Sequence, residues 1–394
     1  MVAMNVDQPL GETTDMKVNV SYANTNRHAY YGVGGALDAY GTTINPLWVV
    51  DTQLNHRLGD HTLSWGLQYT DDKLDDDHPG HNRHLRSHAV NRGLFVQDDW
   101  TLQEHLTLLF GVRVDDHNML ADPVISPRAA LYYKPVESTT VRASFSTGFL
   151  APQVFDEDLH IALAGGEPQI IVNGDNLKEE KSRSFTLGVE STPKVGHGWV
   201  LLEANVFHTE LHDAFALTDE FDVVGTDVVE FTRVNSNGAS VTGMETTVGY
   251  MEGHFEGQVG YVHQKGEYDD AQDFGVTEFF RTPNDLIVAK LFWRQPELVS
   301  AFLGVKYQGS MKVPHYAGFI AEDRLESVDG MLELDASLSR DVFMMNSRVT
   351  LTVGARNLLD EFQEDLDRGI DRDSAYVYGP RAPRTWYGTL AYGF

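Results

Sequence analysis

The last ten residues of the chain alternate between two kinds of side chain. Read as an extended strand, this segment has one face that carries the large apolar residues Phe394, Tyr392, Leu390 and Trp386. The residues between them are mostly smaller or more polar, and a period of two is typical of a β-strand with one apolar face. Chain ends usually fray in water. An apolar face that runs to the final residue therefore predicts a hydrophobic surrounding for this strand.

The same alternation recurs along the whole chain, and no segment shows a convincing helical period. Segment 104–117, for example, places Leu108 and Phe110 on one face and Arg113 on the other. The pattern predicts about 16 strands, at residues 14–23, 46–58, 61–71, 91–101, 104–117, 126–134, 138–148, 181–192, 199–218, 229–251, 254–265, 283–294, 298–310, 329–340, 347–358 and 383–394.

The connections between these strands alternate in length. Short ones, such as 58–61 and 251–254, alternate with long ones rich in Asp, His, Gly and Pro, at residues 71–91, 149–181, 265–283, 310–329 and 358–383. Outer-membrane barrels have short periplasmic turns and long external loops, and they close so that no backbone group is unpaired in lipid. The sequence therefore predicts an all-β fold, a transmembrane antiparallel β-barrel of outer-membrane type, formed by a single domain over residues 1–394.

This fold predicts which side chains face lipid and which face the lumen. On strands 104–117, 181–192 and 329–340, we expect lipid contacts from Leu108, Phe110, Phe185, Leu187, Leu334 and Leu338. The alternate positions, which include Arg113, Glu190 and Glu333, should point to the lumen.

Composition narrows the class of partner. The 394 residues include 30 basic and 58 acidic ones, a formal net charge of -28. This balance argues against a nucleic-acid partner, because binding the phosphate backbone needs a basic surface. The chain has no cysteine, which excludes disulfides, thiolate metal sites and a Cys nucleophile. No run approaches the roughly 18 apolar residues of a spanning helix, and the first 15 residues do not have the pattern of a secretory signal.

Five blocks of the sequence are similar, in the same order, to blocks of a known family. They are SPRAALYYKP (126–135), RASFSTGFLAPQVFDEDLH (142–160), NSNGASVTGMETTVGY (235–250), ARNLLDEF (355–362) and GPRAPRTWYGTLAYGF (379–394). Together they resemble the TonB-dependent outer-membrane receptors, especially those of Bacteroidetes-type bacteria. The resemblance implies a location in the outer membrane of a Gram-negative bacterium. It also implies energy-coupled uptake of a scarce nutrient complex, such as a ferric siderophore, haem or cobalamin.

The resemblance also implies parts that this sequence does not display. Members of the family carry a signal, a segment that engages TonB, and a plug domain inside a barrel of about 22 strands. None of these is recognisable before residue 14, so we expect the chain to be the C-terminal portion of a larger barrel that lacks the plug. One position departs from the family pattern, because Leu150 stands where a basic residue usually precedes Ala-Pro.

The family resemblance sets the expected partners. They are outer-membrane lipid and lipopolysaccharide, the TonB complex, the outer-membrane barrel assembly machinery, and a small-molecule or metal-chelate ligand. No cofactor is expected. The assembly machinery should read a terminal signal formed by Phe394, Tyr392, Leu390 and Trp386.

The long connection 149–181 offers a candidate ligand site. Receptor specificity commonly sits on loops, and this loop carries Asp156, Glu157, Asp158 and His160. These side chains would face the external vestibule and bind or gate the ligand. The alternative is that the carboxylates order the loop through caps and salt links.

A second candidate lies in the histidine-rich segment 71–91. The acidic residues 75–77 are followed by four histidines, His78, His81, His84 and His88. Imidazole and carboxylate groups are ligands for zinc, copper and similar ions. The alternative is a solvated external loop, since histidine-rich tracts bind metals weakly on composition alone.

Two other function classes stay open. No phosphate loop, H-E-x-x-H or G-x-S-x-G motif is present, so we do not expect an enzyme. A passive porin is the first alternative, because a chain with about 16 strands has the size of a porin. An outer-membrane enzyme or adhesin is the second, since a catalytic site can assemble in space without a local signature.

Overall fold

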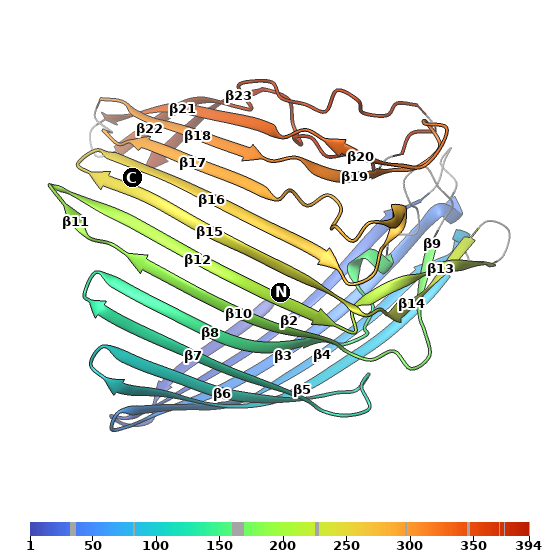
Figure 1. Ribbon diagram of the computed structural model, residues 1–394, viewed down its shortest axis with the longest axis horizontal. Helices are drawn as coiled ribbons and strands as arrows, with labels where there is room; N and C mark the ends of the chain where they lie inside the picture. Colours follow the sequence, from blue (N-terminus) through green and yellow to red (C-terminus); the bar gives the residue numbers. More distant parts are fainter. Residues whose placement is uncertain are drawn as a thin grey trace. The chain divides into compact units, whose positions relative to one another are not determined.

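The computed structural model describes residues 1–31, 37–81, 83–159, 169–224, 228–295, 298–344, 347–369, 371–373 and 375–393. Within these residues almost all regular structure is β, in one 18-stranded sheet and two small sheets (Figure 1). The helices of the described residues are short 3₁₀ turns, and none of them is long and apolar enough to cross a membrane. The predicted all-β class is confirmed.

The strands of the large sheet are mostly long. They are β1 (Val2–Pro9), β2 (Thr14–Tyr30), β3 (Tyr40–Leu58), β4 (His61–His78), β5 (Arg83–Gln103), β6 (Leu106–His117), β7 (Val124–Val136), β8 (Thr139–Leu150), β10 (Glu180–Ser191), β11 (Lys194–Val195), β12 (Gly198–His212), β15 (Gly238–Glu252), β16 (Phe255–Tyr268), β17 (Asp285–Trp293), β18 (Ser300–Gln308), β21 (Met331–Met344), β22 (Ser347–Arg356) and β23 (Thr385–Gly393). The small sheets contain β9 (Gln169–Asn173), β13 (Phe215–Val224) and β14 (Val228–Asn235), and β19 (Met311–His315) with β20 (Arg324–Val328).

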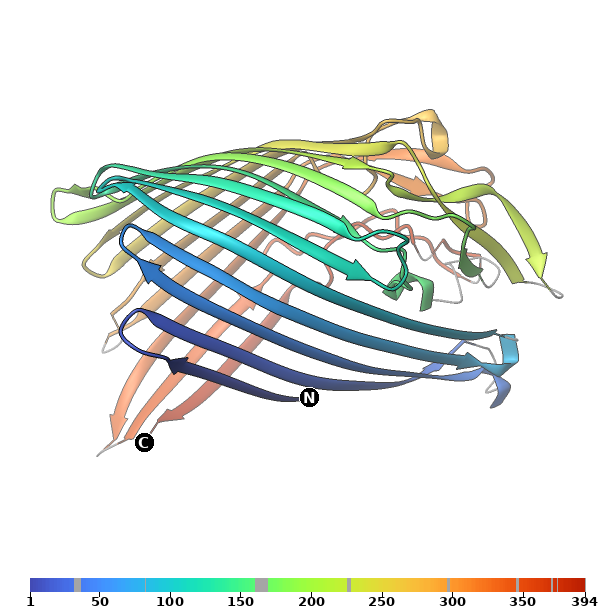
Figure 2. The same ribbon diagram turned by 90° about the horizontal axis from the view of Figure 1, so that it is seen from below.

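The chain divides into two compact units. Unit 1 comprises residues 1–133, 143–185 and 209–239, and unit 2 comprises residues 134–142, 186–208 and 240–394. In unit 1 each strand from β1 to β7 pairs antiparallel with the next one along the chain, and Figure 2 shows the first of these strands side by side in blue. In unit 2 the antiparallel order is β16, β17, β18, β21, β22 and β23.

Tight turns join many of these neighbours, at the positions that the sequence predicted. The two-residue connections β3–β4 and β15–β16 each contain a glycine with positive φ, Gly59 at 59° and Gly253 at 56°. Turns whose twist matches that of the flanking strands need positive φ, which glycine adopts without steric cost. Local turn chemistry therefore sets the antiparallel register at these ends of the strands.

The structure corrects the prediction of a long loop at residues 71–91. Strand β4 continues to His78 and β5 begins at Arg83, so that only four residues separate them. The segment looked like a loop because it is rich in charge, but the charges pair across the hairpin. Asp77 lies opposite His84 and Asp75 lies opposite Arg86, with Arg86 Nε 3.2 Å from Asp75 Oδ2. Cross-strand pairs of opposite charge stabilise such strands.

Other predicted boundaries also differ from the structure. Predicted strand 199–218 covers β12 and the start of β13, and predicted strand 229–251 covers β14 and β15. Both were read as continuous because alternation persists across the short breaks at 213–214 and 236–237. Strand β1 precedes the first predicted strand, and β9, β19 and β20 lie inside the predicted long connections.

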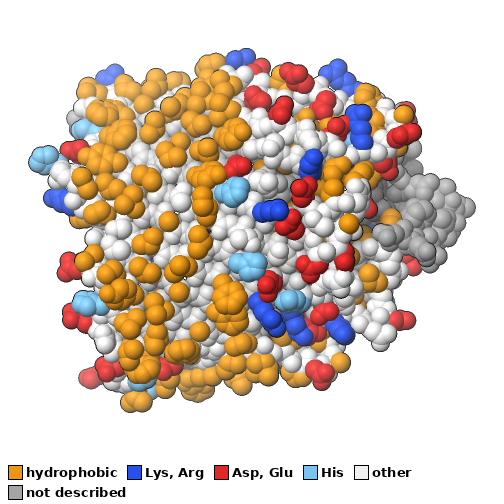
Figure 3. Space-filling model, viewed as in Figure 1, with side chains coloured by type: hydrophobic (Ala, Val, Ile, Leu, Met, Phe, Trp, Pro, Cys, Tyr) orange, Lys and Arg blue, Asp and Glu red, His pale blue; other side chains and the backbone are white. Residues whose placement is uncertain are grey.

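The long strands expose their apolar side chains. Phe110, Phe185, Leu187 and Leu338, all predicted to point outward, are 51–53% exposed, whereas Leu108 and Leu334 are half-buried. On the face in Figure 3, hydrophobic side chains gather over the half of the strands nearest the tight turns, and charged side chains gather toward the other half. Water-soluble monomers rarely expose such continuous apolar surface, so this band requires a non-aqueous neighbour.

The opposite face of the strands carries a hydrogen-bonded polar layer. The Arg113 guanidinium donates to Asp115 at 2.6 and 2.7 Å and to Gln68 Oε1 at 2.8 Å, and Asp115 is buried. Gly93 makes room for this arrangement, because a Cβ there would lie 2.1 Å from Arg113 Nη2. Polar groups thus occupy the positions that apolar side chains fill in a water-soluble sheet.

This inverted arrangement predicts how the two faces respond to a charge. Leu338→Arg should lower the free energy of unfolding in lipid vesicles by about 2–4 kcal/mol, as for a cation placed at mid-bilayer on the lipid face of a barrel. The matched variant is Ser337→Arg, one residue away on the other face, and it should change little. Urea titrations in vesicles measure both. An exposed leucine of a water-soluble protein would tolerate arginine within about 0.5 kcal/mol, and that result for Leu338 would contradict the lipid-facing assignment.

Candidate ligand-binding cavities

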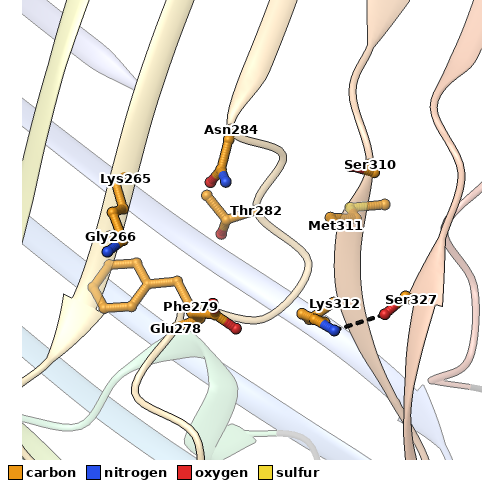
Figure 4. Close-up of a pocket in the computed structure, with 10 residues that line it drawn as sticks. All are labelled: Lys265, Gly266, Glu278, Phe279, Thr282, Asn284, Ser310, Met311, Lys312 and Ser327. Atoms are coloured by element: carbon orange, nitrogen blue, oxygen red, sulfur yellow. Dashed lines mark hydrogen bonds between the residues drawn. The ribbon is translucent and has the colours of Figure 1, made fainter.

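Unit 2 contains a cavity at the ends of its strands away from the tight turns. It measures about 260 Å³ and is bounded by the end of β16, the connection to β17, and the β19–β20 hairpin. Figure 4 shows its lining residues, which are Lys265, Gly266, Glu278, Phe279, Thr282, Asn284, Ser310, Met311, Lys312 and Ser327.

An aromatic side chain forms one wall of this cavity. The Phe279 ring packs against Gly266, where a Cβ would lie 2.4 Å from Phe279 Cδ2, so a larger residue at 266 would displace the ring. The ring also contacts Tyr268, with 4.6 Å between centroids. The backbone holds the loop to the strand as well, because the Phe279 amide donates to the Gly266 carbonyl at 3.1 Å.

Two lysines bring positive charge to the same cavity from different strands. Lys265 Nζ lies 2.7 Å from Glu267 Oε1, and Lys312 Nζ donates to Ser327 Oγ at 2.6 Å (Figure 4). Both lysines are otherwise accessible, since the Lys265 side chain is 58% exposed and the Lys312 bond is on the surface. Lys265 lies beside the Phe279 ring, whereas the Lys312 ammonium points to Ser327 across the cavity, and Glu278 lines the same space (Figure 4). Two cations and an aromatic wall in one cavity suit an anionic ligand with flat apolar surface.

The cavity rests on a small core. Val313, Met311, Val328 and Tyr376 are buried together, with Tyr378 packed against them. The buried His315 ring stacks on Tyr376 at 3.7 Å with an interplanar angle of 5°. His315 Nε2 lies 3.0 Å from Asp367 Oδ2. These contacts fix Asp367 and Tyr376 to the β19–β20 hairpin.

One carboxylate joins the two tyrosines of this core. Tyr376 and Tyr378 each donate their hydroxyl to Asp365 at 2.6 Å. Burial opposes ionisation of Asp365, but these hydrogen bonds outweigh it and lower the pKa of the carboxyl group. Burial, and then the hydrogen bond to Asp365, raise the pKa of both tyrosine hydroxyls. The arrangement is therefore most stable with Asp365 ionised and both tyrosines neutral.

Unit 1 contains a second, larger cavity of about 610 Å³. Its walls come from the start of β5, the β6–β7 connection, the segment 152–158 and the segment 171–177. Apolar lining residues such as Met119 and Ile171 alternate with polar ones such as Ser87 and Asn173. Asp158, one of the residues predicted to contact ligand, also lines it.

Asp158 does not point its carboxylate at solvent. Its two oxygens accept hydrogen bonds from Arg233 Nη2 at 2.6 Å and Nη1 at 2.9 Å, and both side chains are at most 5% exposed. Arg83 Nη2 donates to the backbone carbonyl of Asp158. We call Arg83, Asp158 and Arg233 the arginine clasp. The side chains of Asp156 and Glu157, and all of His160, lie outside the described residues.

The structure separates the predicted metal ligands. His78 is buried on one face of the β4–β5 hairpin, with Nε2 3.4 Å from Asp76 Oδ1. His84 and His88 are exposed on the other face, near Asp77 and Asp71, and the side chain of His81 lies outside the described residues. Among the described side chains, no group of three or more His, Asp or Glu residues is placed to hold a metal ion.

The terminal residues of the predicted assembly signal lie on β23. Trp386 and Leu390 are 71% exposed and Tyr392 is 60% exposed, on the face that β23 shares with Leu351 of β22. Phe394 lies outside the described residues. The assembly role of these residues stays a prediction.

Sequence reasoning missed the cavity residues of unit 2. Lys265 ends a predicted strand, whereas Phe279 and Lys312 fall in two different predicted loops. The one available signal was the alternation of Met311 and Val313 with Lys312, which is typical of a strand with one polar face. Nothing in the sequence brings these three residues together, because their proximity depends on hairpin packing.

Comparison with known proteins places the fold. A family model described as "TonB dependent receptor-like, beta-barrel" matches residues 4–358. The "Iron-regulated outer membrane virulence protein" of Vibrio cholerae serotype O1 is 25% identical over 266 residues, which cover 65% of this chain and 40% of that protein. The chain thus spans less than half the length of this curated relative.

Solved structures agree with this match. The ferric enterobactin receptor of Pseudomonas aeruginosa has a TM-score of 0.76 at 18% identity, over 98% of this chain and 60% of that one. The outer membrane transporter YddB of Escherichia coli scores 0.73 at 15% identity, over 98% and 62%. The siderophore receptor PirA of Acinetobacter baumannii scores 0.72 at 13% identity, over 98% and 61%. At these identities the likeness shows the fold alone, and these proteins are receptors and transporters rather than enzymes.

The Asp365 cluster predicts a pH window for the docking of segment 357–384. Because the pKa of Asp365 is lowered, its ionised carboxylate stabilises the docked segment above about pH 3.9, and this contribution is lost as the pH falls further. A raised tyrosine pKa stabilises below about pH 10 and loses its contribution as pH rises further. The protection factor of the amides at residues 375–378, taken relative to intrinsic exchange at the same pH, should therefore be highest between these limits and lower beyond either one.

Removing one tyrosine hydroxyl should weaken the same docking. Tyr376→Phe should lower the local opening free energy at residues 375–378 by about 1–3 kcal/mol, because a hydrogen bond to a carboxylate is lost. Amide hydrogen exchange measures this at neutral pH. Tyr392→Phe is the matched control, since the Tyr392 hydroxyl contacts Ser347 on β22. Equal exchange in the wild type and Tyr376→Phe would show that Asp365 does not hold the segment.

Proposed function

This chain belongs to the TonB dependent receptor-like, beta-barrel family, and we propose that it serves in energy-coupled uptake of an anionic ferric siderophore across the outer membrane of a Gram-negative bacterium. TonB supplies the energy in this proposal. The chain provides the barrel wall and the ligand-binding cavities. Haem and cobalamin are the alternative nutrient complexes.

The observation that carries this proposal is the unit 2 cavity. Lys265 of β16 and Lys312 of β19 both line it, and the Phe279 ring forms an aromatic wall beside Lys265 (Figure 4). Ferric chelates of catecholate or carboxylate oxygens carry negative charge and attract such cations. The names of the relatives support the same ligand class, since they include a ferric enterobactin receptor and a siderophore receptor.

The exposed apolar band supports the proposed location. Large side chains such as Leu187 and Phe185 are about half exposed on their strands, as expected where lipid replaces water. The relative in Vibrio cholerae is named as an outer membrane protein. We propose the same location for this chain, with lipid on the apolar band.

The test is uptake of radioactive iron from a ferric tris-catecholate siderophore by iron-starved cells that depend on this receptor. The double variant Lys265→Gln and Lys312→Gln should raise the half-saturating concentration by about a hundredfold or more, because each lysine contributes a charge-assisted contact worth about 1.5–3 kcal/mol. Maximal uptake should change less, since the barrel stays intact.

The matched control is Lys134→Gln. Lys134 is an exposed lysine at the end of β7, next to the tight turn to β8, so uptake should match that of the wild type. Uptake that is insensitive to the cavity lysines, or absent for every ferric chelate while the receptor is present at the cell surface, would contradict the proposed function.

A further inference from the structure

We infer that Arg83 and Arg233 form a binding site for an anionic group of the ligand, and that the Asp158 carboxylate occupies this site until the ligand displaces it. The inference deepens the proposed function and rests on it for the ligand class, a ferric chelate with anionic oxygen atoms. It assigns a site in unit 1, whereas the cavity lysines belong to unit 2, and it gives Asp158 the role of an internal stand-in for the ligand.

The geometry of the Asp158 carboxylate is that of a bound oxyanion. Arg233 donates to it through both terminal nitrogens, at 2.6 and 2.9 Å, and the Phe155 amide donates to Oδ2 at 2.9 Å. This two-pronged arrangement is the one by which arginine recognises carboxylates and phosphates. The Phe155 ring lies under the Arg233 guanidinium at 4.6 Å and fixes its plane. The site is thus already shaped for an anion.

Arg83 has donors that the internal carboxylate does not use. Its Nη2 donates to the Asp158 carbonyl and lies 3.6 Å from Asp76 Oδ2. Its Nε and Nη1 are buried and have no hydrogen-bond partner among the described residues. A buried donor without an acceptor costs free energy. Arg83 therefore has donor capacity that the closed clasp leaves unused.

The local charge favours an anion. Arg27 joins the same network through Thr43, whose hydroxyl donates to Asp76 Oδ1 at 2.5 Å. The described part of this network brings three guanidinium groups, those of Arg27, Arg83 and Arg233, near the carboxylates of Asp76 and Asp158. When Asp158 moves away, Arg233 loses the carboxylate that accepts from both of its terminal nitrogens. Breaking a buried ion pair is strongly unfavourable, so a ligand anion would be drawn to the vacated place.

A route for the ligand lies beside the clasp. Asp158 lines the 610 Å³ cavity of unit 1 together with Pro152 and Val154 of the same segment. A chelate in this cavity would lie against the segment that carries the Asp158 carboxylate. Exchange of one anion for the other then requires movement of residues 152–158 and not of the strands that carry Arg83 and Arg233.

The experiment compares two variants that break the same ion pair. The probe is the ferric tris-catecholate trianion, and its equilibrium binding to the purified protein in detergent micelles is followed by quenching of tryptophan fluorescence. Asp158→Asn uncovers the cations, so binding should tighten by about tenfold, the effect of one charge-assisted hydrogen bond. Arg233→Gln removes the site, so binding should weaken by about tenfold or more.

Affinity changes of opposite sign in the two variants distinguish displacement of Asp158 by the ligand from simple loosening of the loop. Both variants lose the Asp158–Arg233 pair, and a loop that was only loosened would change binding in the same direction in both. Shifts in one direction, or no tightening in Asp158→Asn, would overturn the inference. Asp341→Asn is the control, because Asp341 is a buried aspartate of β21 paired with Arg348 at 2.6 Å, and binding should stay unchanged.

A second measurement uses the unmodified protein, in case a variant does not fold. Addition of ferric tris-catecholate should speed amide hydrogen exchange at residues 155–158, because displacement of the carboxylate frees the Phe155 amide. Slower or unchanged exchange at saturating probe would also overturn the inference. Failure of the proposed function gives a different result. If cells took up no iron but the two purified variants still shifted binding in opposite directions, the proposed function would be wrong and the anion site would stand.

Discussion

The long strands expose their apolar side chains on one face and carry polar side chains on the other, the reverse of a water-soluble sheet. The rest of the structure depends on this inversion. A sheet in water hides its apolar face against another layer. Here side chains such as Leu187, Val353 and Leu390 are more than half exposed. The stable arrangement is then one in which the surroundings are apolar and every backbone group pairs within the sheet. Tight turns and long strands follow from this need for uninterrupted pairing.

On the polar face, the strands are aligned mainly by pairs of opposite charges on neighbouring strands. Lys306 lies opposite Glu333 and within 3.0 Å of it, and Arg142 contacts Glu190 of another strand. A shift of register by one residue would move each charge to the apolar face. The strong acidity of the chain therefore does not prevent packing at these positions, because carboxylates such as Asp115 and Glu333 have cationic partners. Outside the large sheet, the stack of His315 on Tyr376 adds to the small core of Met311, Val313 and Val328.

Alternation of side chains was sufficient to predict the fold class, the tight turns and the exposure of residues such as Phe110 and Leu338. It could not predict where strands end, because charge pairing across β4 and β5 made a hairpin out of a segment with the composition of a loop. The cavities could not be predicted from the sequence, for a different reason. Lys265, Phe279 and Lys312 come from three separate elements, and the partner that buries Asp158 is 75 residues away. Periodicity carries no information about such distant contacts.

The parallel pairing of β9 with β14 has a consequence for the order of folding. Hairpins such as β3–β4 and β15–β16 close short loops, but β9 must wait for a partner that begins with Val228, after β10, β12 and β13 have been made. Closing this long loop costs more entropy than closing a hairpin. Asp158 sits midway, 75 residues from Arg83 and 75 from Arg233. The segment that carries it therefore docks after its surroundings have formed, and by the same reasoning it belongs among the first parts of unit 1 to open.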